Sequence, residues 1–206
     1  MVVRLTVVYD NLALRPDLMP NWGFSCLVEK EEVCLLFDTG ANGGILLHNM
    51  DKLGIDPRKI GGVMLSHNHW DHVGGLESLL SVNPEINTYR VGFSSRAKEF
   101  LPGFMTTGTL RGWGVKEQSL IVTTTRGLVV VTGCSHPGLE NILKVASQYG
   151  RVYAVIGGFH GFSKFEVLRE VPLILPCHCT QYKQRIMELY PNAAQKCGVG
   201  KIVEIG

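Results

Sequence analysis

The sequence lacks long apolar runs and runs of like charge. None of its apolar segments approaches the roughly 20 residues that a membrane-spanning helix needs. Lys and Arg number 20 against 18 Asp and Glu, for a formal net charge of +2, and neither sign clusters along the chain. The charge pattern therefore predicts neither a basic groove for nucleic acid nor a polybasic patch for a membrane surface.

The sequence also lacks a recognisable leader and a disulfide framework. Met1–Pro16 shows no basic segment followed by an apolar stretch and a small-residue cleavage site. The 6 cysteines are irregularly spaced, and several lie inside apolar, strand-like runs. Thiols in such a setting are typical of small buried side chains in a reducing compartment. We therefore expect a cytoplasmic protein.

What the chain does contain fits a compact globular protein. It has 206 residues, of which 45% are hydrophobic, and this is enough to bury one sizeable core. The 24 glycines and the low charged fraction of 18% favour a mixed helix and strand protein with many tight turns. We therefore predict one domain that spans residues 1–206.

The two halves of the chain show the same order of predicted elements. The first half reads as a strand, a hairpin turning at Glu31 and Glu32, a helix closed by Gly54, a strand, a helix that starts at Asp71 and a further strand. Residues 94–114 show no clear periodicity and are expected to form a loop near a site or an edge. The second half reads as a hairpin over 119–133, a helix over 136–150, strands over 151–158 and 172–179, and a helix over 181–190. This order predicts two sheets with helices outside them.

The segment SHNHWDHVGG, Ser66–Gly75, concentrates metal-type side chains. His67 and His69 are two positions apart at the end of an apolar strand, so their side chains project to one side. Asp71 and His72 follow where the chain turns into a helix and can point to a neighbouring position. This combination fits a pair of zinc or iron ions that keep coordination positions open for water. A histidine-rich surface turn is the plain alternative, which the density of the motif disfavours.

The sequence resembles the metallo-β-lactamase superfamily. SHNHWDH matches the His-x-His-x-Asp-His signature of that superfamily, and LLFDTG at Leu35–Gly40 matches the strand and turn before it. Within the superfamily the chain looks most like the branch of dihydropterin (ribofuranosylaminobenzene phosphate) synthase-like metal-dependent hydrolases. The supporting stretches are YDN (9–11), GFSCLVE (23–29), TGCSHPGLENIL (132–143), VIGGFH (155–160) and PCHCT (176–180). The resemblance implies an α+β fold, a four-layer αββα sandwich.

The resemblance also implies further metal ligands. His178, in PCHCT, stands where the superfamily places its last metal histidine. In GCSHPG, much of the superfamily has an aspartate that bridges two metals, and this chain has Cys134 in the nearest comparable place. Three interpretations stay open: His136 binds a metal, the Cys134 thiolate does, or Cys134 only packs. We favour His136, because imidazole suits borderline metals.

Two other polar residues follow strand-like segments. His160 matches the rim of the site in this branch, where it could donate a proton or hold a substrate oxygen; the alternative is a core histidine. Asp38, in FDTG, can accept the N–H of a ligating imidazole and fix its tautomer. A turn aspartate that caps its own backbone is the alternative. Cys177 and Cys179 flank His178 and are expected to pack on other sides of the strand.

The predicted site indicates a hydrolase. Two divalent metals, zinc first with iron and manganese as alternatives, would hold a hydroxide that cleaves an ester, phosphodiester or lactone bond of a small-molecule substrate, which can carry phosphate. Asp71 and His160 are the catalytic candidates. The first alternative is a synthase that condenses a dihydropterin pyrophosphate with an aminobenzene ribosyl phosphate. The second alternative is a metal-binding module without catalysis, since the bridging aspartate is missing.

Overall fold

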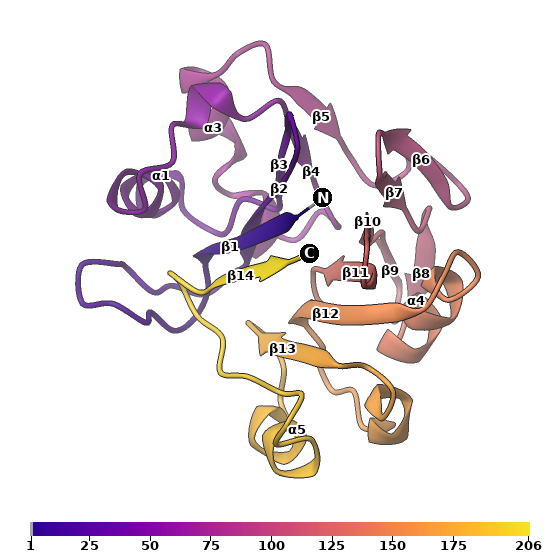
Figure 1. The fold of residues 1–206 in the computed structure, drawn as a ribbon. Helices are drawn as coiled ribbons and strands as arrows, with labels where there is room; N and C mark the ends of the chain where they lie inside the picture. Colours follow the sequence, from indigo (N-terminus) through magenta and orange to yellow (C-terminus); the bar gives the residue numbers. More distant parts are fainter. Residues whose placement is uncertain (1) are drawn as a thin grey trace. The chain divides into compact units, whose positions relative to one another are not determined.

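Two six-stranded sheets form the framework of the chain, one in each of two compact units. The computed structural model describes residues 2–206 (Figure 1). The first unit contains the chain up to Arg90 together with Cys197–Gly206, and the second contains Val91–Lys196. The α+β class expected from the sequence is confirmed, while the single domain over 1–206 stays a prediction.

The sheet of the first unit has the order β14-β1-β2-β3-β4-β5. Its strands are β1 (Val3–Tyr9), β2 (Ser25–Lys30), β3 (Val33–Phe37), β4 (Gly62–Met64), β5 (Asn87–Tyr89) and β14 (Ile202–Ile205). The predicted hairpin forms between β2 and β3, with Glu31 at its turn in a left-handed conformation (φ 54°). Strands β4 and β5 run parallel to β3, whereas the remaining pairs are antiparallel. In Figure 1 the yellow β14 therefore lies beside the indigo β1.

The helices of the first unit are α1 (Gly43–Lys52), the 3-10 helix Pro57–Lys59, α2 (Trp70–Val73) and α3 (Leu76–Val82). Helices α1 and α3 bury apolar side chains in a core shared with the sheet. Leu46 and Met50 of α1 and Leu79 of α3 share this core with β-strand residues. The sequence predicted one helix from Asp71 to Val82, and the break between α2 and α3 corrects it. At Gly75 a Cβ would lie 2.3 Å from the Thr39 carbonyl oxygen, so the chain bends closely past that backbone.

The sheet of the second unit has the order β13-β12-β11-β10-β7-β6, and β8 and β9 form a separate two-stranded sheet. The strands are β6 (Lys98–Leu101), β7 (Phe104–Thr106), β8 (Leu110–Gly112), β9 (Val115–Glu117), β10 (Leu120–Thr124), β11 (Gly127–Thr132), β12 (Val152–Gly158) and β13 (Leu173–Cys177). The expectation of a loop over 94–114 was wrong, since β6, β7 and β8 lie there. These strands have three or four residues each, too few for a clear alternating pattern, and pairing with neighbours stabilises them.

Helices α4 (Leu139–Ala146) and α5 (Lys183–Leu189) and the 3-10 helix Phe165–Leu168 complete the second unit. Leu139, Ile142, Leu143 and Ala146 recur at helical spacing and are buried in one core with the sheet. The predicted helix over 136–150 is shorter than expected, because residues 136–138 form the turn before it. Among residues 2–206, no helix is long and apolar enough to cross a membrane.

In each unit the parallel strands bring their carboxyl ends to one edge. Asp38 follows β3, and His67 comes shortly after β4, the parallel neighbour of β3. In the second unit the candidates Cys134, His160 and His178 come shortly after β11, β12 and β13, which are parallel in this order. In each unit, candidate side chains therefore lie together at the carboxyl ends of neighbouring parallel strands.

Candidate metal centre

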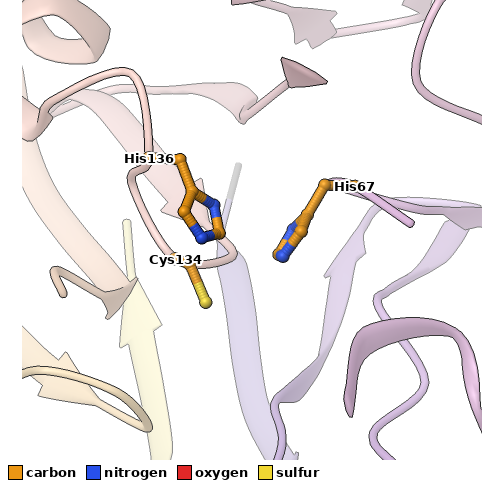
Figure 2. A group of neighbouring side chains, drawn as sticks. All are labelled: His67, Cys134 and His136. Carbon is orange, nitrogen blue, oxygen red and sulfur yellow. The ribbon is translucent and has the colours of Figure 1, made fainter. Parts of the chain in front are cut away.

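The predicted histidine cluster forms within the first unit, between β4 and α2. His67, drawn as sticks in Figure 2, has a buried side chain. The centroid of its ring lies 4.5 Å from that of His69 and 4.2 Å from that of His72. Asp71 places Oδ2 3.9 Å from Nε2 of His72. The strand end and the first turn of α2 thus bring the four residues together, as their spacing predicts.

Asp38 organises two of these imidazoles. Its carboxylate is fully buried and accepts hydrogen bonds from the backbone N–H of Ser66 (2.7 Å), the Ser66 hydroxyl (2.7 Å) and Nδ1 of His72 (2.7 Å). Because the Ser66 hydroxyl hydrogen goes to Asp38, its Oγ accepts from Nδ1 of His67 at 2.9 Å. Both rings then carry hydrogen on Nδ1 and the lone pair on Nε2, the form in which imidazole binds a metal.

Trp22 contacts the carboxylate of Asp71, a contact that the sequence did not predict. Its indole Nε1 donates to Oδ2 of Asp71 at 2.9 Å, although half of Trp22 is exposed to solvent. A tryptophan 49 positions before its partner belongs to no spacing motif, so only the fold reveals this contact. The hydrogen bond restrains the orientation of Asp71.

Glu117 has the corresponding role in the second unit. Its fully buried carboxylate accepts hydrogen bonds from the backbone N–H groups of Cys134, Ser135 and His136, each at 2.9 Å. It also accepts from Nδ1 of His136 at 2.8 Å. His136, on the turn drawn in Figure 2, therefore carries its lone pair on Nε2. The sequence interpretation missed Glu117, whose only signal is an acidic residue just before the buried strand β10.

The remaining candidates of the second unit lie at strand ends. Cys134 is buried on the same turn as His136 (Figure 2), so the alternatives of imidazole and thiolate ligation stay open. His178, directly after β13, is buried. The ring of His160, after β12, has its centroid 5.4 Å from that of His136 and 4.8 Å from that of Trp113. His160 is half-buried.

Backbone strain gathers at these residues. Apart from Glu31 in its hairpin, the non-glycine residues with positive φ in residues 2–206 are Asp38 (57°), Trp113 (50°), Ser135 (61°), His160 (43°) and His178 (44°). Left-handed conformations are uncommon for residues with side chains, and they concentrate where function holds them in place. Asp38 and Ser135 also take part in the hydrogen bonds described above, and the other three strained residues lie at candidate positions or on the β8–β9 turn.

The donor set fits divalent metal ions. Buried oxygen acceptors fix Nδ1 of His67 and His72 in the first unit and of His136 in the second. The first unit adds the Asp71 carboxylate. Oriented imidazole and carboxylate are the ligands that zinc and related borderline metals prefer. The chemistry of the residues thus supports metal binding, while the assignment of each ligand stays a prediction.

Comparison with known proteins agrees with the fold and these motifs. Residues 23–92 match the family model described as the Metallo-beta-lactamase superfamily. A solved metal-dependent hydrolase of the β-lactamase superfamily is 26% identical, with a TM-score of 0.79 over 98% of this chain and 99% of that chain. The metallo-β-lactamase fold protein YhfI from Bacillus subtilis, 14% identical, has a TM-score of 0.74 over 99% of both chains. The chain thus has the metallo-β-lactamase fold, and residues 23–92 carry the match to that superfamily that the sequence motifs indicated.

A curated relative also aligns with nearly the whole chain. It is the 7,8-dihydropterin-6-methyl-4-(beta-D-ribofuranosyl)-aminobenzene-5'-phosphate synthase of Methanocaldococcus jannaschii, 27% identical over 279 residues. The alignment covers 97% of this chain and 95% of the relative. Because the alignment is longer than the 206 residues of this chain, the relative carries segments that this chain lacks.

Proposed function

We propose that the protein is a metal-dependent hydrolase of a small-molecule ester, phosphodiester or lactone, with a binuclear metal centre. The proposed ligands are His67, His69, Asp71, His72, His136 and His178. The observation that carries the proposal is the buried carboxylate in each unit that accepts the Nδ1–H of a candidate ligand, Asp38 for His72 and Glu117 for His136. Histidines that bind metals almost always donate their other ring N–H to a carboxylate, a backbone carbonyl or water, so these pairs support the assignment.

The chain's own residues have distinct parts in this proposal. When bound, two divalent ions supply Lewis acidity and lower the pKa of water, with zinc as the first expectation. Asp71 binds one ion and, held by Trp22, orients the attacking group. His160 donates a proton to the leaving group or holds a substrate oxygen from the rim. Cys134 is the alternative ligand to His136.

Metal analysis of histidine variants tests the ligand set. Elemental analysis of the purified protein should give two equivalents of metal, and His72→Ala or His136→Ala should each lose at least one. His48→Ala is the matched control, since His48 lies on α1, where Nε2 contacts the Asp17 carbonyl oxygen at 3.1 Å. Full metal retention in both ligand variants would contradict the assignment.

A substrate panel tests the reaction. The metal-loaded protein should hydrolyse at least one of a carboxylic ester, a lactone and a phosphodiester, and His72→Ala should abolish that activity. Two equivalents of metal without turnover on any of the three would favour the metal-binding module without catalysis.

A synthase is the second candidate, because the curated relative that matches 97% of this chain has that name. In this case the protein would join a dihydropterin pyrophosphate to an aminobenzene ribosyl phosphate and release diphosphate. Mass spectrometry of the two substrates incubated with the metal-loaded protein would detect the condensation product. The relative has segments that this chain lacks, and this difference weakens the transfer of its reaction to this chain.

A further inference from the structure

A cavity of about 250 Å³ lies wholly within the second unit, beside His136. Its walls come from the tip of the β8–β9 hairpin, the His136 turn, the start of α4 and the segment after β12. Phe159 and Phe162 contribute buried aromatic surface, and Trp113 and His160 stand at the hairpin side. Pockets for whole drug-sized ligands have about 300–1,000 Å³, so this cavity fits one part of a substrate.

Trp113 occupies a position that tryptophan does not favour. It forms the two-residue connection between β8 and β9 together with Gly114, with φ values of 50° and 77°. Such turns favour Asn, Asp or Gly at the first central position. The indole also gains little from burial, because 68% of Trp113 is exposed. An unfavourable backbone with an exposed ring indicates that this side chain serves a ligand.

Backbone and ring contacts place the indole at the edge of the cavity. A Cβ at Gly112 would lie 2.1 Å from the carbonyl oxygen of His136, so β8 contacts the His136 turn through its backbone. A Cβ at Gly161 would lie 3.6 Å from Cη2 of Trp113, and the rings of Trp113 and His160 meet edge to face at 85°. The indole therefore forms part of the wall of the cavity that His136 also lines.

We propose that this cavity binds an uncharged, flat ring of the substrate, with Trp113 as the residue that determines this specificity. The proposal rests on the proposed function, because it places the ring next to a reaction at His136. Aromatic walls favour a ring, through stacked or edge-to-face contacts. At the rim Nζ of Lys164 pairs with Oε1 of Glu140 at 2.7 Å, so this cation is neutralised and does not call for an anionic group.

Binding of a ring can be tested without metal or turnover. Benzamide and acetamide are titrated into the protein, and the indole N–H resonances are followed by NMR, with the Trp113 signal identified by its loss in Trp113→Phe. Benzamide should shift the Trp113 resonance in a saturable way and acetamide should not. Tyr149→Ala, which removes another exposed aromatic of the second unit, is the control that should bind benzamide normally. Absence of a benzamide-induced shift at Trp113 would overturn the inference.

A second pair of probes links the cavity to the metal. Phenylphosphonate should bind the zinc-loaded protein about tenfold more tightly than methylphosphonate, the upper range for an aromatic pair. Trp113→Ala should reduce this ratio to about twofold or less, and Trp113→Phe should keep most of it. An unchanged ratio in Trp113→Ala would refute the role of Trp113 even if zinc and hydrolysis are intact. Benzamide binding by a protein that holds no divalent metal would refute only the proposed function.

Discussion

Glu117→Gln isolates the contribution of one buried carboxylate to the candidate centre. In the wild type, Oε1 of Glu117 accepts the backbone N–H groups of Cys134 and Ser135, and Oε2 accepts the N–H and Nδ1 of His136. Glutamine keeps one of these oxygens and replaces the other by an NH₂ donor. Two donors that faced the lost oxygen then have no acceptor in a buried environment.

The expected change in the free energy of unfolding follows from these contacts. A hydrogen bond to a charged group contributes roughly 1.5–3 kcal/mol, so the loss of two should lower the free energy of unfolding by about 3–6 kcal/mol. If the NH₂ group takes the place of Oε2, it can donate to Nδ1 of His136 only in the tautomer with hydrogen on Nε2. That tautomer cannot bind a metal, so metal loss should accompany the loss of stability.

Urea unfolding of the metal-free protein gives the stability change, elemental analysis gives the metal content, and ¹⁵N NMR of the imidazoles gives the His136 tautomer. Glu170→Gln, at an exposed glutamate of the same unit, controls for the removal of a charge. The reasoning would be refuted if Glu117→Gln matched wild type in unfolding free energy and in metal content.

Two further substitutions and one labelling experiment probe the rest of the molecule. Asp38→Asn should lower the unfolding free energy by about 3–5 kcal/mol and release metal, because the buried partner of His72 loses its charge; a variant as stable as wild type would contradict this. Trp22→Phe should weaken metal binding about tenfold by removing the donor to Asp71, measured by competition with a chelator, and unaltered affinity would argue against it. Burial, aided by the Glu29 carboxylate, raises the pKa of the Cys34 thiol to about 11. The rate at which iodoacetamide labels Cys34 should therefore rise about tenfold per pH unit from pH 8 to 10, because the thiolate fraction rises in this way. A rate that levels off near pH 9 would contradict the raised pKa.

Local patterns in the sequence predicted the elements that carry the histidine cluster. Side chains alternate between the two sides of a short apolar strand, and the chain then turns into a helix. This local pattern predicts where His67, His69 and His72 lie relative to one another, and the structure has the same arrangement. The same kind of local pattern predicted the β2–β3 hairpin, which the structure contains. Such features depend on neighbours within a few residues, which the sequence displays directly.

Features that depend on distant neighbours escaped prediction. Glu117 contacts a turn that lies 17–19 positions later, and its role becomes visible only when β9 and the end of β11 meet. The strands β6–β8 are too short to show a period, so their pairing and not their composition defines them. The break at Gly75 similarly results from the close approach of the Thr39 backbone.

The left-handed backbone at Asp38, Ser135, His160 and His178 limits how heat-resistant this protein can become. Each such conformation costs on the order of 1–3 kcal/mol, and glycine would relieve the steric part of that cost. At Asp38, His160 and His178, however, glycine would also delete a side chain that the proposed chemistry uses. Selection for a higher melting temperature alone should therefore erode activity at these positions first, and a thermostable descendant that keeps its function should gain its stability elsewhere in the chain.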